Sequence, residues 1–176
     1  MQLRKSSIKF LGHIVTSQGL KPDPEKIKAI RDMKEPSNVT ELRGFIGFVQ
    51  YLAKFLPNLS DVIEPLRKLT KQDVKWLWSD KESEAFDKTK EMLTKEPVLR
   101  YYDPKEQLEI QCDASDIGLG AALLQNGQTI AYSSPALTET KKRYATIEKD
   151  MLAITWSVEK YHQYTYGRQT TVKSDH

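Results

Sequence analysis

The stretch Leu108-Glu109-Ile110-Gln111-Cys112-Asp113 (LEIQCD, 108–113) decides the fold of the second half of the chain. Its apolar residues alternate with polar ones, and this period of two is typical of a β-strand with one buried face. The run Ala114-Ser115-Asp116-Ile117-Gly118, rich in turn-forming residues, follows directly. We therefore expect Asp113 at the end of a half-buried strand.

Further elements follow this strand. Residues 119–125 and 129–133 flank Asn126-Gly127, the strongest short signal for a β-hairpin. A long helix is predicted from about 142 to 164, closed by Gly167, and residues 170–174 are predicted to form another strand. The helix is expected to bury Ile147, Met151, Ile154 and Val158. This order of strand, hairpin, helix and strand predicts an α/β unit.

The first half is predicted to be a small helical bundle over residues 22–95, after a short apolar strand at 8–15 and a turn at 17–20. Asp23 is placed to cap a helix that begins at Pro24, and Asn38 with Glu41 form a capping box for the next. Ser60 is predicted to cap a third helix, and Ser79 with Glu82 a fourth. Their apolar positions at helical spacing include Ile27, Ile30, Leu42, Phe45, Ile46, Val49, Leu66, Phe86 and Leu93. The fold class is therefore α+β.

Composition sets limits on function. The single cysteine, Cys112, excludes an intramolecular disulfide or a cysteine zinc cluster and indicates a reducing intracellular setting, cytoplasmic or nuclear. No apolar run reaches the roughly 18 residues of a membrane span. Residues 1–96 hold 18 Lys and Arg against 14 Asp and Glu, whereas residues 97–176 hold 9 against 10. A mildly basic first half is compatible with contacts to a nucleic-acid backbone.

Three carboxylates are candidates for a metal site. Asp113 and Asp175 lie at predicted strand ends, and Asp150 lies on the predicted helix beside Met151 and Ile154. Acids on such elements can converge, and two bridged divalent ions activate water for phosphodiester hydrolysis. Oxygen ligands of this kind suit Mg²⁺, with Mn²⁺ as the alternative. The residues alone leave the other interpretation open, in which Asp113 caps a turn and the other two are solvated.

A series of motifs carries a resemblance to a known family. In the first half they are Phe10-Leu11-Gly12-His13, Asp23-Pro24, Glu41-Leu42-Arg43-Gly44-Phe45-Ile46-Gly47 and Pro65-Leu66. In the second half they are Cys112-Asp113-Ala114-Ser115, Gly118-Leu119-Gly120-Ala121, Ile130-Ala131-Tyr132-Ser133-Ser134, Leu152-Ala153-Ile154, Tyr166-Gly167-Arg168 and Ser174-Asp175-His176. With them the whole chain resembles part of the reverse transcriptase and ribonuclease H of gypsy-type long-terminal-repeat retroelements (retrotransposon Pol polyproteins).

The resemblance implies three regions and a set of site residues. Residues 1–20 would be the end of the polymerase palm with a primer-grip-like hairpin, 21–96 a helical thumb and connection, and 97–176 a C-terminally truncated RNase H-like domain. Asp113, Asp150 and Asp175 would be the catalytic metal ligands. Asp150 stands where the family has a glutamate, and Glu148 is the alternative to it.

The resemblance also implies contacts with an RNA–DNA hybrid or duplex through His13, Gly44 and Gly47. For His13 the alternative is hydrogen bonding within a turn, and for the two glycines it is close helix–helix packing. Trp76, Trp78 and Tyr51 fit core positions better than base stacking.

The resemblance finally implies a parent enzyme that copies RNA into DNA and cleaves RNA in hybrids, within the rest of a Pol polyprotein. The polymerase carboxylates would precede residue 1 and the fourth RNase H carboxylate would follow residue 176. The chain alone is therefore expected to be inactive as a polymerase and weak in hybrid cleavage. A non-catalytic nucleic-acid-binding module and a degenerate retroelement remnant are the alternatives.

Overall fold

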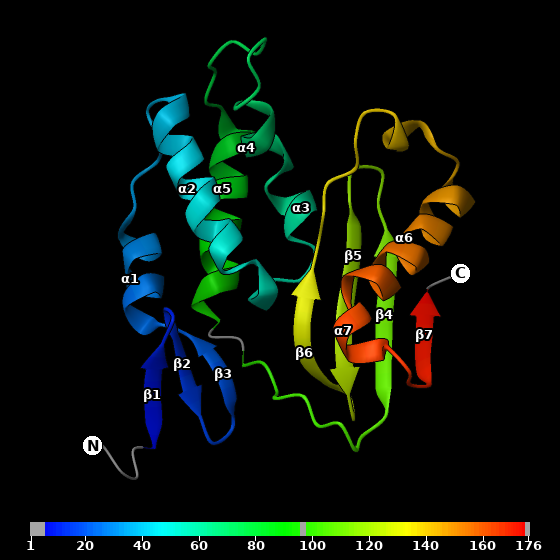
Figure 1. Cartoon of the computed structure of the whole chain (residues 1–176). Helices are drawn as coiled ribbons and strands as arrows, with labels where there is room; N and C mark the ends of the chain where they lie inside the picture. Colours follow the sequence, from blue (N-terminus) through cyan, green and yellow to red (C-terminus); the bar gives the residue numbers. More distant parts are fainter. Residues whose placement is uncertain (1–5, 96–97, 175–176) are drawn as a thin grey trace.

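The computed structural model describes residues 6–95 and 98–174, which fold into a helical unit beside an α/β unit (Figure 1). The first unit consists of β1 Ser7–Phe10, β2 His13–Thr16, β3 Gly19–Pro22, α1 Pro24–Asp32, α2 Val39–Tyr51, the 3-10 helix η1 Ala53–Phe55, α3 Leu59–Val62, α4 Glu64–Lys68 and α5 Asp80–Thr94. The second consists of β4 Leu108–Ala114, β5 Leu119–Gln125, β6 Gln128–Ser133, η2 Lys141–Arg143, α6 Thr146–Lys160, α7 His162–Thr165 and β7 Thr170–Ser174. None of the helices among the described residues is long and apolar enough to cross a bilayer.

The helical unit confirms most of the predicted bundle, but the segment that precedes the bundle differs from the prediction. The predicted strand at 8–15 is instead a hairpin, because Leu11 and Gly12 both take positive φ angles (45° and 67°) and reverse the chain between β1 and β2. A third strand, β3, pairs antiparallel with β2 over part of the segment predicted as a turn. The buried positions predicted from helical spacing all lie in one core.

The helix caps differ in how well the sequence predicted them. Asn38 accepts a hydrogen bond from the backbone N–H of Glu41 at 2.9 Å, and the Ser79–Glu82 capping box opens α5, as predicted. The cap predicted for Ser60 is wrong. Asn58, in the left-handed conformation with φ 47°, precedes α3, and Ser60 lies buried inside that helix. Its hydroxyl is used for a contact with the other unit.

Asp23 caps α1 and also ties it to the hairpin. Its Oδ1 accepts a hydrogen bond from the Glu25 N–H at 3.0 Å, and its Oδ2 lies 2.7 Å from Lys9 Nζ, which keeps the pKa of Asp23 below its ordinary value of 3.8.

Asp23→Ala should lower the free energy of unfolding by about 0.5–2 kcal/mol. A carboxylate with a lowered pKa stabilises the fold above its unfolded-state pKa, and that contribution disappears as pH falls through the folded-state value.

The check is denaturant unfolding of wild type and Asp23→Ala at pH 7 and at decreasing pH. The difference in the free energy of unfolding between the two proteins should be largest at pH 7 and should decrease only below about pH 4. A difference that stays constant down to acid pH would contradict the assigned ion pair.

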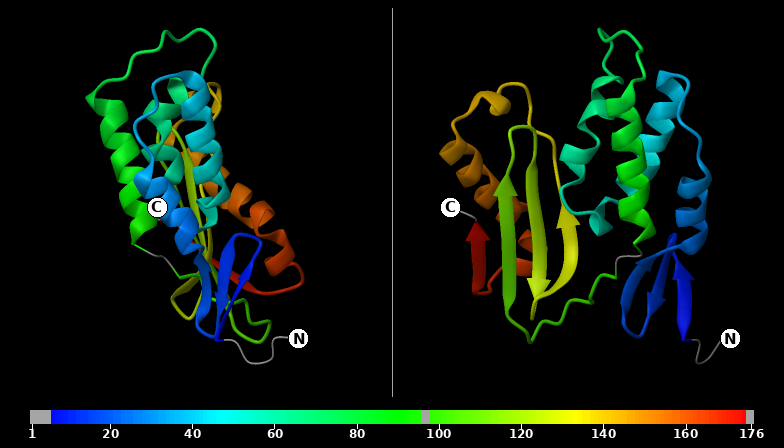
Figure 2. Two further views of the ribbon diagram at one scale, coloured as in Figure 1. Left: turned by 90° about the vertical axis from the view of Figure 1, so that its left-hand side faces the viewer. Right: turned by 180° about the vertical axis from the view of Figure 1, so that it is seen from behind.

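The α/β unit is a four-stranded sheet in the order β6-β5-β4-β7 with helices on one face (Figures 1 and 2). Strand β4 pairs antiparallel with β5 and parallel with β7, and Asn126-Gly127 form the predicted turn with φ 51° and 73°. Leu108, Ile110 and Cys112 are buried, as their alternation predicts. Seen from behind, the opposite face of the sheet carries no helix of the described residues (Figure 2, right).

The buried face of α6 is only partly the one predicted, since Ile154 packs against the core of the α/β unit but the other three predicted residues do not. Ile147 and Met151 are 64% and 56% exposed, and Val158 is also exposed. The side that faces the sheet instead carries Lys149, Asp150, Ala153 and Ser157. Ala153 and Ser157 are small and fully buried, so they allow the helix to pack closely on the strands. The helix is also shorter than predicted, since residues 141–143 form η2 and α6 begins at Thr146.

Candidate functional site

Asp113 lies on strand β4 with its side chain exposed. Its neighbours Cys112 and Ala114 pack in the core that α6 covers, so strand alternation turns Asp113 to the opposite face of the sheet. The Asp113 Oδ1 atom accepts a hydrogen bond from the Ala114 N–H at 2.8 Å. On that side Asp113 borders an open cleft of about 960 Å³, together with Gln111, Gly120 and Lys173. Its carboxylate is therefore accessible to a ligand.

Asp150 lies in the second turn of α6 and is only 5% exposed. Among the described residues, no hydrogen bond or ion pair involves its side chain. The alternative ligand Glu148 is exposed, and its carboxylate accepts a hydrogen bond from the Ala145 N–H at 2.8 Å, so it caps the helix. Asp150 thus has a carboxylate that no other described residue engages, whereas that of Glu148 is used as a cap, which favours Asp150 over Glu148 as the candidate.

The start of α6 is tied to the segment that follows Asp113. Lys149 is 7% exposed at its side chain, and its Nζ atom lies 2.7 Å from Asp116 Oδ1. This lysine lowers the pKa of Asp116 through the hydrogen bond and its charge. The ion pair links the helix that carries Asp150 to the loop that follows β4, which begins two residues after Asp113.

The predicted third ligand, Asp175, lies outside the described residues, as does His176. Within residues 6–95 and 98–174, no group of three acidic, histidine or cysteine side chains is placed to hold a metal ion. The last registered pair between β4 and β7 joins Cys112 to Ser174. The shared site of Asp113, Asp150 and Asp175 therefore stays a prediction.

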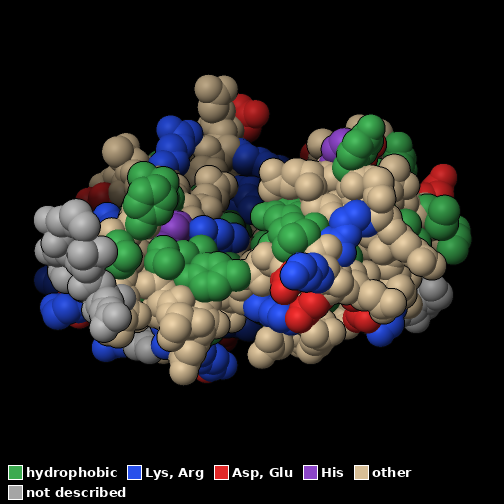
Figure 3. Space-filling model, turned by 60° about the horizontal axis from the view of Figure 1, so that its bottom comes forward, with side chains coloured by type: hydrophobic (Ala, Val, Ile, Leu, Met, Phe, Trp, Pro, Cys, Tyr) green, Lys and Arg blue, Asp and Glu red, His purple; other side chains and the backbone are tan. Residues whose placement is uncertain are grey.

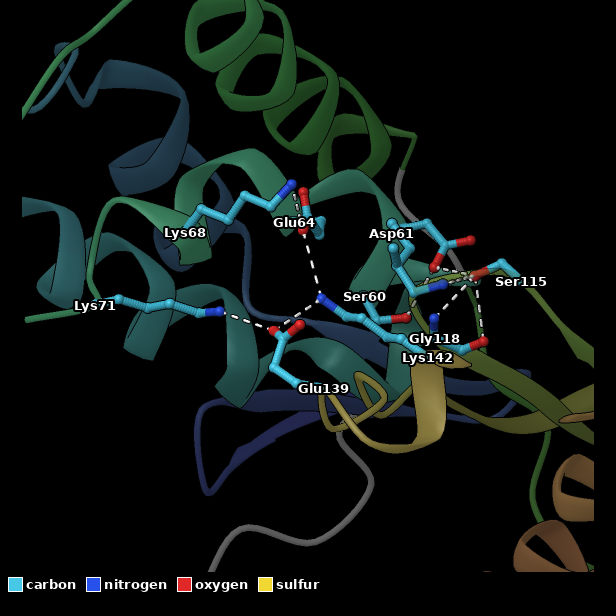
Figure 4. Close-up of polar contacts among 10 residues, drawn as sticks. Ser60, Asp61, Glu64, Lys68, Lys71, Ser115, Gly118, Glu139 and Lys142 are labelled. Atoms are coloured by element: carbon cyan, nitrogen blue, oxygen red, sulfur yellow. Dashed lines mark hydrogen bonds and ion pairs between the residues drawn. The ribbon is translucent and has the colours of Figure 1, made fainter. Parts of the chain in front are cut away.

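The loop after Asp113 is fastened to the helical unit (Figure 4). The Ser115 hydroxyl donates a hydrogen bond to Asp61 Oδ1 of α3 at 2.9 Å and accepts one from the Gly118 N–H at 2.9 Å. Beside it, the Ser60 N–H donates to the Ser134 hydroxyl at 3.0 Å, and the two hydroxyl oxygens lie 2.6 Å apart. We call Ser60, Asp61, Ser115, Gly118 and Ser134 the junction.

At two positions in this region, atoms of the helical unit lie so close to the backbone that only glycine fits. A Cβ atom on Gly118 would lie 2.7 Å from Asp61 Oδ1 and 3.0 Å from Ser60 Cβ, and closer still to Ser60 Oγ. On Gly120 it would lie 2.5 Å from Asn58 Oδ1. Sequence reasoning missed the junction, because it joins residues as many as 74 positions apart and no local pattern marks such a pair.

Around the junction, charged side chains form a second set of contacts between the units (Figure 4). Glu139 lies 2.9 Å from Lys71 Nζ and 3.3 Å from Lys142 Nζ. Lys142 also lies 3.8 Å from Glu64. The Lys71–Glu139 pair is exposed on both sides and contributes at most about 1 kcal/mol in water.

Gly44 and Gly47 lie on the open side of α2. A Cβ atom at either position would meet nothing within 4 Å, so close helix–helix packing, the alternative considered for them, is wrong. Together with Lys26, Phe48 and Tyr51 they border a shallow cleft of about 550 Å³. Lys26 Nζ lies 5.3 Å from the centre of the Phe48 ring. This α2 face combines open backbone, a cation and aromatic edges.

His13 packs against the α2 face through Tyr51. It is buried, and its ring stacks on Tyr51 with centroids 5.2 Å apart. Burial and the nearby charge of Lys54 lower its pKa. The Tyr51 hydroxyl donates a hydrogen bond to the Leu11 carbonyl in the hairpin turn. A direct contact between His13 and nucleic acid stays a prediction. Trp76 and Trp78 stack on each other and pack, partly buried, against the bundle core, as expected for them. The core placement expected for Tyr51 is wrong, since that residue is 47% exposed on the α2 face.

Comparison with known proteins gives relatives over nearly the whole chain. A retrovirus-related Pol polyprotein from transposon 297 of Drosophila melanogaster is 40% identical over 98% of this chain, and the match covers 16% of that relative. A transposon Tf2-3 polyprotein of Schizosaccharomyces pombe is 34% identical over 93% of the chain, which covers 13% of that protein. The chain thus spans less than a fifth of the length of these relatives.

Solved structures share the fold. The foamy viral protease-reverse transcriptase in complex with RNA/DNA hybrid superposes with a TM-score of 0.85 at 22% identity, over 97% of this chain and 24% of that one. The same viral protein in complex with dsDNA gives 0.84 at 23% identity, over 98% of this chain and 37% of that one. Residues 78–172, more than half of the chain, match the sequence model of the RNase H-like domain found in reverse transcriptase, and the chain belongs to that family.

Proposed function

We propose that this chain is a nucleic-acid-binding fragment of a gypsy-type retrotransposon Pol polyprotein, and that its α2 face contacts the backbone of an RNA–DNA hybrid or DNA duplex. The observation that carries the binding proposal is the open backbone at Gly44 and Gly47 beside Lys26 and Tyr51. Glycines without neighbours let a duplex approach closely, and shape and charge rather than base sequence would set the affinity. The fold that the chain shares with the foamy viral complexes supports it.

We propose that the parent polyprotein carries out RNA-directed DNA synthesis and hydrolyses RNA in hybrids. RNase H-like domains of reverse transcriptases generally use divalent metals. Asp113, Asp150 and Asp175 would hold Mg²⁺, or Mn²⁺ in its place, since carboxylate oxygens are the donors these ions prefer. Asp113 has an accessible carboxylate, and no hydrogen bond or ion pair among the described residues engages the Asp150 side chain, so each can act as an oxygen donor, although Asp113 lies on the sheet face opposite the one that α6 covers. The metal ions would supply an activated water and stabilise the leaving oxygen.

We further propose an intracellular location, supported by the single cysteine of the chain. A non-catalytic nucleic-acid-binding module would bind duplexes in the same way. The two functions differ only in hybrid cleavage by a longer Pol chain.

The binding proposal predicts that a charge on the α2 face weakens association. Gly47→Glu places a carboxylate where a side chain meets no neighbours, so the fold should persist while the duplex is repelled. The matched control is Gly47→Gln, which has the same size and no charge. Titration of a labelled hybrid should give a several-fold higher Kd for the glutamate variant at about 50 mM salt, and a smaller difference at about 200 mM.

Three results decide the proposal. Binding by the wild-type chain should weaken steeply with salt and depend little on base sequence. Equal affinities of the glutamate and glutamine variants would show that the duplex does not pass over α2. Salt-independent binding, or strong preference for one sequence, would contradict the backbone-contact model as a whole.

A further inference from the structure

A third cleft lies where the helical unit meets the α/β unit. Its volume is about 570 Å³. One wall comes from the end of α2 and from η1, and it carries Gln50, Tyr51 and Lys54. The other wall comes from the end of α6 and from α7, and it carries Lys160, Gln163 and Tyr164. Viewed from below, Lys and Arg side chains lie along the hollow between the two units, with Asp and Glu side chains beside some of them on the α/β unit (Figure 3).

The charge in this cleft is of one sign. Lys54 and Lys160 line it, and no carboxylate among the described residues does. Neither lysine forms an ion pair with any other described residue. Lys54 is half-buried with its ammonium group 5.4 Å from the centre of the Phe55 ring, and this burial lowers its pKa. A half-buried cation without a counter-charge is unfavourable, and an anionic ligand would offset that cost.

The cleft continues the α2 face. Tyr51 borders both hollows. Gly47 and Gln50 are three residues apart and lie on one side of α2, and Gln50 borders the cleft together with Lys54 of η1. The path from Lys26 over the two glycines thus leads to Lys54 and across to Lys160. The side-chain amides of Gln50 and Gln163 add hydrogen-bond donors of the kind that contact phosphate oxygens.

We propose that Lys54 and Lys160 form a phosphate-binding clamp between the two units, which holds the backbone of the duplex that lies on the α2 face. This inference rests on the proposed function, since it extends the same duplex from the helical unit onto the α/β unit. The junction keeps the two walls together, because it fastens α3 to Ser134, which directly follows β6 and itself borders the cleft. The clamp is specific for backbone phosphates and not for bases, because lysine acts as a point charge.

The salt dependence of binding tests the clamp directly. Removing one lysine–phosphate interaction should reduce the slope of log K against log salt by about 0.9 for a duplex. For Lys54→Gln and Lys160→Gln, the ratio of affinities at about 50 and 200 mM salt should therefore fall roughly 3.5-fold each. The slope of the double variant should fall by about twice as much as that of either single variant. The probes are an end-labelled RNA–DNA hybrid and DNA duplex of the same sequence.

The matched control is Lys81→Gln in the first turn of α5, whose N-terminal end lies at the opposite end of the helical unit (Figure 1). It should leave the slope unchanged. Lys54→Arg should retain the slope of the wild type, because it keeps the charge. Thermal unfolding followed by circular dichroism shows whether each variant is folded. If Lys54→Gln does not fold, the exposed Lys160 decides the question alone.

The outcomes separate the two proposals. Wild-type binding without salt dependence would remove the proposed function. Salt-dependent wild-type binding with an unchanged slope in Lys54→Gln/Lys160→Gln would overturn the clamp and leave the α2 face standing. An equal reduction of the slope in Lys81→Gln would also overturn the clamp, because the effect would then not depend on where the lysine lies.

Discussion

Gly118→Ala should destabilise the chain by about 1–3 kcal/mol, a large effect for a single added methyl group. The new Cβ atom would lie 2.7 Å from Asp61 Oδ1 and 3.0 Å from Ser60 Cβ. Ser60 cannot move aside easily, since it is buried and bonded to Ser134. The strain would fall on the loop after Asp113, and it would loosen the contact between the two units.

The measurement is denaturant unfolding of Gly118→Ala beside Gly44→Ala. At Gly44 a Cβ atom meets nothing, and alanine in a helix is favoured over glycine by about 0.5–1 kcal/mol, so this variant should be stabilised. The double variant Ser60→Gly/Gly118→Ala should recover part of the stability, because it removes the hydroxyl and the Cβ atom that the new methyl group meets. An unfolding midpoint of Gly118→Ala equal to that of the wild type would contradict the close contact at the junction.

Asp113→Asn should reduce hybrid hydrolysis at least about 100-fold in a longer Pol chain that cleaves RNA–DNA hybrids. Residues that only support metal ligands are worth about 10–100-fold in metal affinity or activity, and a ligand itself is worth more. Asparagine keeps the size of the side chain and its hydrogen bond to the Ala114 N–H but removes the charge that holds the cation. Hybrid affinity should be unchanged or increased, because the variant carries one negative charge fewer.

The control for this prediction is Asp87→Asn, an exposed carboxylate on α5. It should cleave at the rate of the parent chain. Cleavage should be followed at saturating hybrid with Mg²⁺ and again with Mn²⁺, so that a change in metal affinity is separated from a loss of the catalytic step. Hydrolysis by Asp113→Asn within a few-fold of the parent rate would remove Asp113 from the metal site.

The sequence by itself determined the elements whose signals are local. Asp23, Asn38 and Ser79 cap helices where expected, because a cap depends on residues within one turn. Asn126-Gly127 form the hairpin turn, because few residue pairs take two positive φ angles without strain. The alternation at Leu108, Ile110 and Cys112 placed one face of β4 in the core. From it followed the exposed position of Asp113.

Only the tertiary structure decided which side of α6 is buried. Apolar residues lie on more than one side of that helix, so periodicity alone offers several faces. The sheet accepts the side with Ala153 and Ser157, because small residues let the helix axis approach the strands. That choice buries Asp150 and exposes Met151, the reverse of what hydrophobicity predicts for the two.

The contacts between the units could not be predicted from the sequence either. Ser60 and Ser134 meet across 74 positions, and Lys54 faces Lys160 across a cleft that exists only once both units are folded. No sequence pattern marks serines or lysines that meet at such separations, because their proximity depends on how the two hydrophobic cores pack against each other. Local free-energy preferences fixed the helices, turns and strands of this chain, and the packing of one core against the other placed its candidate functional residues.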